Sequence, residues 1–323
     1  MGRLIEGEWI AEDKFLTKKG KFQRENTQIR DQISSAEGAM FPPESGRYHL
    51  YVSLACPWAH RTLIMRKLKG LESAISVDVV SPLMMEKGWF FEPPAASNPL
   101  SHKPAGIKEL VNLHQVYQHH DPSYTGRVTV PILWDKKTDK AVSNESEEII
   151  RMLNSEFSKI ATDQTNYYPT DLREEINKIN AIIYEGVNNG VYKTGFAANQ
   201  EAYEEALTNL FSCLDLLEDR LSKNRYLVGD QLTEADIRLF VTLIRFDAVY
   251  VGHFKCNLRR IHDYKNLSGF LRELYLMPAF KETTNLDHIK SHYYRSHKFL
   301  NPSGIVPKGP ILDLSGPHGR DLF

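Results

Sequence analysis

Residues 48–59, Tyr-His-Leu-Tyr-Val-Ser-Leu-Ala-Cys-Pro-Trp-Ala, decide the fold of this 323-residue chain. β-Branched and aromatic residues form a compact run over 48–55, which predicts a buried strand. Pro57 follows at a position where helices favour proline, the first residue of the helix. Apolar residues recur at helical spacing over 59–68, and the pattern stops at Gly70, a residue favoured just past a helix end. The stretch therefore predicts a strand that leads directly into a helix.

A second predicted strand over 75–80 completes a strand–helix–strand unit, which requires a parallel pair and a right-handed crossover. Downstream, the segments 129–134 and 141–142 flank a turn-like stretch and predict a hairpin, and a helix is predicted over 145–153. This order of elements is typical of a thioredoxin-like domain, which we place at 47–155.

The second half of the chain follows the 3.6-residue period of amphipathic helices. The period occurs at 172–188, 203–221, 233–247, 264–276 and 286–294. Thr233 and Asp236 form a capping-box variant that marks one helix start. We therefore expect an all-helical domain over 170–300.

Three segments do not fit either pattern. The polar residues 1–46 are interpreted as an extension packed over a domain, and the residues 301–323, rich in Pro and Gly, as an irregular tail. The residues 81–126 predict a long loop with one short helix near 110–117.

Composition argues against several functions. The net charge of −1 provides no field of one sign, so we expect no nucleic-acid partner. No apolar run approaches the ~18 residues of a membrane span, and the amino terminus lacks the pattern of a signal peptide. We expect a cytoplasmic protein without a membrane partner.

The three cysteines, Cys56, Cys213 and Cys256, are too few and too scattered for a disulfide framework or a zinc site.

Cys56 is the candidate nucleophile. It lies between a strand end and Pro57, where the first helical amides have no internal partner and the helix dipole favours an anion. In such places the pKa of cysteine falls from ~8.5 into the range of ~3.5 to 7.5. The alternative is a buried, inert cysteine. Ala59 occupies the partner position of a Cys-x-x-Cys motif, so the second thiol has to come from outside, which points to glutathione.

Two further features offer a place for glutathione. If the Val130–Pro131 bond is cis, the backbone of Val130 is free to pair with an extended peptide; a trans proline on an edge strand is the alternative. Glu145 and Ser146 at a predicted helix start can hold the amine and carboxylate of a γ-glutamyl group, or can simply cap the helix. His114, His119 and His120 are imidazoles that could bind a metal, but no Cys, Asp or Glu spacing there completes a shell, so we expect no metal.

Longer blocks of sequence extend this pattern over most of the chain. They are Tyr51-Val-Ser-Leu-Ala-Cys-Pro-Trp-Ala-His-Arg-Thr-Leu63, Glu86-Lys-Gly-Trp89, Val130-Pro-Ile-Leu-Trp-Asp135, Asn144-Glu-Ser146, Asn188-Asn-Gly-Val-Tyr-Lys-Thr-Gly-Phe196, Val228-Gly-Asp-Gln-Leu-Thr-Glu-Ala-Asp-Ile-Arg238, Arg245-Phe-Asp247, His253-Phe-Lys-Cys-Asn257, His288-Ile-Lys-Ser-His-Tyr293 and Asn301-Pro-Ser-Gly-Ile305. With these blocks the chain resembles the glutathionyl-hydroquinone reductases, also called Xi-class glutathione transferases, which are related to the fungal omega-like enzymes.

The resemblance implies roles for individual residues. Cys56 would be the nucleophile, and Tyr192 and Tyr293 would face an aromatic substrate and transfer protons, although a lone tyrosine in a helical domain is more often a core residue. The residues implied to hold glutathione are Trp89, Arg127, Val130, Glu145 and Ser146. A homodimer is also implied.

The implied reaction removes glutathione from an S-glutathionyl-hydroquinone, through a mixed disulfide between Cys56 and glutathione, and releases glutathione disulfide. Glutathione is thus the expected co-substrate. Two alternatives stay open. One is an omega-like thiol transferase or dehydroascorbate reductase that uses the same Cys56, and the other is a non-catalytic glutathione-binding module.

Overall fold

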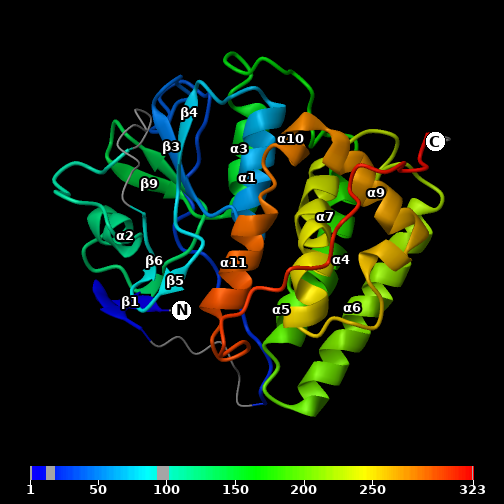
Figure 1. Ribbon diagram of the computed structural model, residues 1–323. Coiled ribbons are helices and arrows are strands. Elements are labelled where there is room, and N and C mark those ends of the chain that lie inside the picture. The colour runs from blue at the N-terminus through cyan, green and yellow to red at the C-terminus, as the bar shows by residue number, and fades with distance from the viewer. Residues whose placement is uncertain (1, 12–18, 93–101, 322) are drawn as a thin grey trace. The chain divides into compact units, whose positions relative to one another are not determined.

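The computed structural model describes residues 2–11, 19–92, 102–321 and 323. The chain divides into two compact units, one of residues 1–14 and 25–165 and the other of residues 15–24 and 166–323 (Figure 1). The first unit is a thioredoxin-like sheet with helices, and the second is all-helical, as the sequence predicts. The finer division at 46, 155, 170 and 300 stays a prediction.

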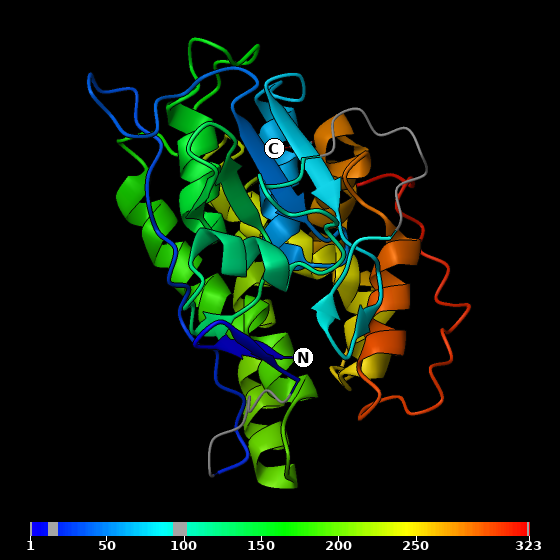
Figure 2. The same ribbon diagram turned by 90° about the vertical axis from the view of Figure 1, so that its left-hand side faces the viewer.

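The main sheet of the first unit has four strands in the order β4-β3-β8-β9. They are β3 (Tyr48–Val52), β4 (Ile75–Val79), β8 (Ile132–Asp135) and β9 (Lys140–Ser143). The β3 and β4 pair is parallel (Figure 2, blue and cyan), whereas β3–β8 and β8–β9 are antiparallel. All five residues of β3 are buried, which fits a central strand covered on both faces.

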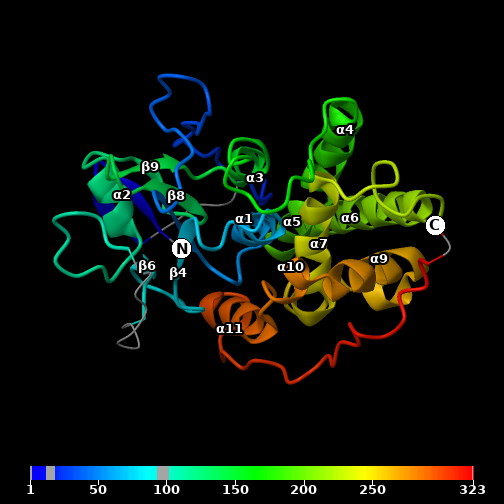
Figure 3. The ribbon, with the colours of Figure 1, turned by 90° about the horizontal axis from the view of Figure 1, so that it is seen from above.

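Helices cover both faces of this sheet. Helices α1 (Pro57–Leu68) and α3 (Ser146–Ser155) lie together on one face, and α2 (His114–His120) lies on the other (Figures 1 and 3). Gly70 ends α1 with a φ of +61°, and a Cβ there would lie 1.8 Å from Oγ1 of Thr162. Glycine is therefore required at this position both by the backbone and by the space around it.

Two small sheets complete the first unit. One has the order β2-β1-β7 and consists of β1 (Arg3–Ile5), β2 (Glu8–Ile10) and β7 (Gly126–Arg127). The other pairs β5 (Met84–Met85) with β6 (Gly88–Trp89). Residues near the amino terminus thus pair with a strand more than a hundred positions away.

The second unit contains eight α-helices and three short helices of other types within the described residues. The α-helices are α4 (Arg173–Ile183), α5 (Gly190–Gly195), α6 (Gln200–Leu221), α7 (Glu234–Arg245), α8 (Val251–His253), α9 (Lys265–Leu276), α10 (Pro278–Lys281) and α11 (Leu286–Ser296). The others are the π-helices η1 (Tyr184–Asn188) and η2 (Phe246–Tyr250) and the 3₁₀-helix η3 (Ile261–Asp263). The predicted capping box is confirmed, because the backbone amide of Thr233 donates to Asp236 Oδ2 at 2.8 Å.

Two predicted helix ends are wrong in type. The periodic segments 172–188 and 233–247 do not end as α-helices but pass into η1 and η2. A π-turn accommodates an extra residue and rotates the side chains that follow, and such turns are frequent at functional sites. The amphipathic period cannot reveal this change, because it reports only which residues are apolar.

The described residues after 300 form no helix or strand, yet side chains hold them to the second unit. Arg320 is 2% exposed and donates to the carbonyl oxygens of Leu221 at 3.1 Å and Asn224 at 2.7 Å. Figure 1 shows this segment, in red, running along the helices. In the part of the chain that the structure describes, no helix has the length and apolar character needed to cross a membrane.

Candidate active site

Cys56 is the N-cap residue of α1, with an extended backbone (φ −75°, ψ 121°) and Pro57 at the first helical position. Its backbone carbonyl accepts from the amide of His60 at 3.0 Å, which starts the helical bonding. Strand β3 ends at Val52 rather than at 55 as expected, because a turn follows in which the amide of Cys56 donates to Ser53 O at 3.1 Å. The side chain is half-buried. The sulfur therefore lies at the positive end of the α1 dipole.

The Val130–Pro131 peptide bond is cis, which confirms one of the two possibilities that the sequence left open. It directly precedes β8, the neighbour of β3. The Cys56 thiol lies 3.5 Å from the carbonyl oxygen of Val130. A thiol can donate to this oxygen and a thiolate cannot, so ionisation of Cys56 gives up this contact.

Glu145 and Ser146 stand at the start of α3. Glu145 is the N-cap residue, and its Oε1 accepts from the amide of Glu147 at 3.2 Å, so the capping role considered for it is present. Ser146 is 1% exposed, and its hydroxyl accepts from Arg61 at 3.4 Å. Because Arg61 belongs to α1, this bond joins the helix that starts at Cys56 to the helix that starts at Ser146.

Trp89 and Arg127 lie in the two small sheets rather than in the main sheet. Trp89 in β6 is 6% exposed, and its carbonyl accepts from the amide of Leu113 at 2.9 Å. Arg127 in β7 is half-buried and stands opposite Arg3. The structure thus places Cys56 next to Val130, and Glu145 next to Ser146, whereas Trp89 and Arg127 come from separate elements.

Three tyrosines meet in the second unit. The hydroxyl groups of Tyr192 in α5 and Tyr293 in α11 are 2.6 Å apart, and that of Tyr250 in η2 is 3.0 Å from Tyr293. Burial raises the pKa of Tyr293 and of Tyr250 well above the ordinary value, so both phenols stay protonated at neutral pH. The structure therefore brings together the two tyrosines predicted from the sequence and adds Tyr250, which the sequence reasoning missed.

Two buried histidines lie beside this cluster. The ring nitrogens of His253 and His297 are 3.2 Å apart, and both rings lie near that of Tyr293. Burial lowers the pKa of His253 to about 4. Burial, with the nearby His292 and His253, holds the pKa of His297 well below its ordinary value. Both imidazoles are therefore neutral in the folded chain at neutral pH.

A pH effect on stability follows. The unfolded chain binds a proton at His253 near pH ~6.5 and the folded chain does not, so stability is full above that pH and falls as the pH drops towards 4. Between pH 7.5 and 5 the loss from this one group should be about 2 kcal/mol. Urea unfolding of the wild type and of His253→Gln at several pH values checks this. An equal pH dependence in both proteins would show that His253 is not the cause.

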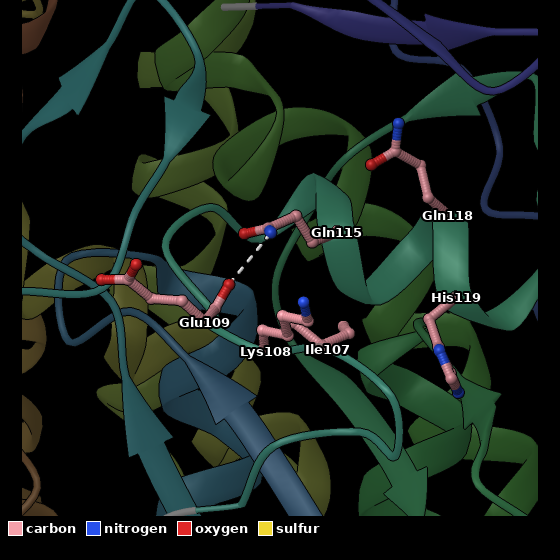
Figure 4. A pocket seen from close by; sticks show the side chains of 6 residues that line it. All are labelled: Ile107, Lys108, Glu109, Gln115, Gln118 and His119. Carbon is pink, nitrogen blue, oxygen red and sulfur yellow. Dashed lines mark hydrogen bonds between the residues drawn. The ribbon is translucent and has the colours of Figure 1, made fainter.

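The three histidines considered for a metal do not converge. His114 stacks on Trp9, His119 bonds Asp139 at 2.7 Å, and His120 accepts from the amide of Ala141 at 3.2 Å. Among residues 2–11, 19–92, 102–321 and 323, no group of three or more His, Cys, Asp or Glu residues could hold a metal ion. An open pocket beside α2 (Figure 4) is lined by His119 but by no residue of the predicted site.

In the first unit, a cysteine at the start of α1 lies beside a cis-proline, and the second unit is all-helical. This combination defines a glutathione transferase. Family models agree with this class. The glutathione S-transferase N-terminal domain matches residues 55–156, and the glutathione S-transferase C-terminal domain matches residues 200–273.

Similar proteins narrow the class. Glutathionyl-hydroquinone reductase YqjG of Escherichia coli is 54% identical over 100% of this chain and 99% of its own, and reductase PcpF of Sphingobium chlorophenolicum is 53% identical over 98% of both. A solved Xi-class glutathione transferase from Natrialba magadii matches with a TM-score of 0.91 and 46% identity, over 100% of this chain and 97% of its own. The glutathione-bound structure of YqjG matches with a TM-score of 0.88 and 52% identity, over 99% of both chains. This chain belongs to the glutathionyl-hydroquinone reductases, the Xi class of glutathione transferases.

Proposed function

We propose that this chain removes glutathione from S-glutathionyl-hydroquinones, with a second glutathione as reductant, and yields the hydroquinone and glutathione disulfide. The observation that carries the proposal is Cys56 at the N-cap of α1, with Ala59 where a dithiol enzyme has its second cysteine. Two full-length relatives that carry the reductase name support the substrate class.

In the proposed complex, the tripeptide runs from Cys56 to the start of α3. Its cysteinyl backbone pairs with Val130, and its γ-glutamyl amine and carboxylate are held by Glu145 and Ser146. Trp89 and Arg127 complete the set, Trp89 by apolar contact and Arg127 by its positive charge towards the glutathione carboxylates. Glutathione acts as a co-substrate, and the chemistry calls for no metal.

The first half-reaction breaks an aromatic carbon–sulfur bond. When the ring takes up a proton at the carbon that bears sulfur and becomes its keto tautomer, that carbon is saturated. The Cys56 thiolate then attacks the glutathione sulfur, the new sulfur–sulfur bond forms, and the electron pair of the carbon–sulfur bond leaves as an enolate. Protonation of the enolate gives the hydroquinone, so the aryl carbon is reduced and the two sulfurs are oxidised.

The second half-reaction restores the enzyme. The thiolate of a second glutathione attacks the mixed disulfide, glutathione disulfide leaves, and Cys56 returns as a thiolate. We assign the proton transfers of the first half-reaction to Tyr192 and Tyr293, because their hydroxyl groups are hydrogen-bonded to each other and burial keeps Tyr293 protonated.

A second candidate is the omega-like thiol transferase or dehydroascorbate reductase. This candidate is supported by a relative that is 50% identical to this chain and is named glutathione S-transferase omega-like 2, from Schizosaccharomyces pombe. Initial rates on a glutathionyl-hydroquinone and on dehydroascorbate decide between the two. We expect kcat/KM to favour the glutathionyl-hydroquinone by at least about 10-fold. Similar or reversed values would favour the omega-like activity, and no turnover of either would favour a binding module.

We further propose that the chain acts in the cytoplasm as a homodimer. Three free cysteines suit a reducing compartment. The reactants of the proposed cycle, glutathione and an aromatic thioether, require neither nucleic acid nor a membrane.

A further inference from the structure

The segment 27–30 runs along the start of α3. The amide of Asn144 donates to the carbonyl of Ile29 at 3.0 Å, and the amide of Ile29 donates to Asn144 Oδ1 at 3.3 Å. Arg30 forms an antiparallel bridge with Ser143, the last residue of β9. This part of the amino-terminal segment therefore pairs with the backbone that leads into Glu145.

Thr27 reaches the Glu145 carboxylate itself. Its hydroxyl donates to Oε2 at 2.9 Å, while Oε1 accepts from the amide of Glu147. Both carboxylate oxygens thus have a donor, and the donors come from different segments. A carboxylate held at both oxygens cannot rotate freely, so it is oriented before any ligand arrives.

Asn144 continues the connection to the cis-proline loop. Its side-chain nitrogen Nδ2 donates to the Tyr117 hydroxyl at 3.1 Å. That hydroxyl donates to the backbone carbonyl of Thr129 at 2.8 Å and accepts from the backbone amide of Thr129 at 3.1 Å. Tyr117 is 1% exposed and Asn144 is 4% exposed. Because the phenol binds both backbone groups of the residue before Val130, it fixes the position of Val130.

We propose that Thr27, Asn144 and Tyr117 form a positioning network that sets the two ends of the glutathione site relative to each other. Thr27 orients the Glu145 carboxylate for the γ-glutamyl amine, and Tyr117 with Asn144 holds Val130 for the cysteinyl backbone. The inference rests on the proposed function. These residues act through Glu145 and Val130, so they are positioning residues.

The two ends can be tested separately with two ligands. Glutathione carries the α-amino group of its γ-glutamyl residue, and the analogue glutaryl-cysteinyl-glycine lacks only that group. Thr27→Val removes the hydroxyl and keeps the shape, so it should weaken glutathione binding by about 3- to 10-fold while leaving the analogue within about twofold. Tyr117→Phe should weaken both ligands by about 3- to 10-fold, because both carry the cysteinyl backbone.

Tyr48→Phe is the matched control. Tyr48 is a buried tyrosine of the same sheet whose hydroxyl donates to the carbonyl of Pro42 at 2.7 Å, at the end of β3 remote from Cys56. Like Tyr117→Phe, the Tyr48→Phe change removes a buried tyrosine hydroxyl that donates to a backbone carbonyl. Calorimetric titration should give a Kd for both ligands within about twofold of the wild type.

The outcomes separate the inference from the proposed function. If the wild type binds glutathione but Thr27→Val weakens both ligands equally or neither, the role of Thr27 is overturned. If Tyr117→Phe binds like Tyr48→Phe, the role of Tyr117 is overturned. A wild type that does not bind glutathione would overturn the proposed function, and this inference with it.

Discussion

Replacing Cys56 with serine should lower turnover of a glutathionyl-hydroquinone on the order of 10³-fold or more, because a hydroxyl at this position neither ionises nor forms a disulfide. Reduction of a simple glutathione mixed disulfide should fall as far, since both reactions pass through the same sulfur. Steady-state rates on the two substrates provide the measurement.

Cys213 offers a matched control for this change. It is 9% exposed, and burial raises its pKa to about 11, so it is a thiol at neutral pH and a poor nucleophile. Cys213→Ser should keep both rates near those of the wild type. Activity that survives in Cys56→Ser and disappears in Cys213→Ser would show that Cys213, and not Cys56, is the nucleophile.

Changing Tyr192 and Tyr293 together to phenylalanine should slow turnover of the glutathionyl-hydroquinone by about 10²-fold, the usual contribution of a positioned proton donor. Reduction of a simple mixed disulfide should stay mostly intact, because that reaction needs no proton on a ring carbon. The two hydroxyl groups are 2.6 Å apart, so the double variant removes both members of that bond. It also removes the contact of the Tyr250 hydroxyl with Tyr293, at 3.0 Å, so the assay on the simple mixed disulfide controls for damage to the cluster. Parallel assays of the two substrates measure the difference.

Tyr203→Phe serves as the control in the same unit. The hydroxyl of Tyr203 donates to the carbonyl of Lys255 at 2.8 Å, and the variant should behave like the wild type on both substrates. Equal loss of both activities in the double variant would mean that the tyrosines support the fold or the binding of glutathione, and not the release of the aryl group.

Much of the fold can be predicted from the sequence because its pattern is local. The strand, the helix after Cys56 and the parallel second strand follow from hydrophobic period and from Pro57 and Gly70. The short elements cannot be predicted in this way. Helices α8 and α10, of 3 and 4 residues, and the two-residue strands of the small sheets are shorter than the window that a period needs. The helix expected near 110–117 starts at His114 and ends at His120.

The candidate site divides along the same line. Cys56, Pro131 and Glu145 stand at boundaries between elements, where residue type alone signals a special role. Contacts between distant segments do not show in the sequence. Thr27 contacts Glu145 across 118 positions of sequence, and Arg61 contacts Ser146 across 85. These two hydrogen bonds can be identified only in the folded structure.

The mixed disulfide on Cys56 is the central claim, and the intact mass of the protein after exposure to a glutathionyl-hydroquinone tests it most directly. Without free glutathione the second half-reaction cannot occur, so the wild type should gain the mass of one glutathionyl group and Cys56→Ser should gain none. A wild type that releases hydroquinone without gaining mass, or an equal gain in Cys56→Ser, would contradict the account.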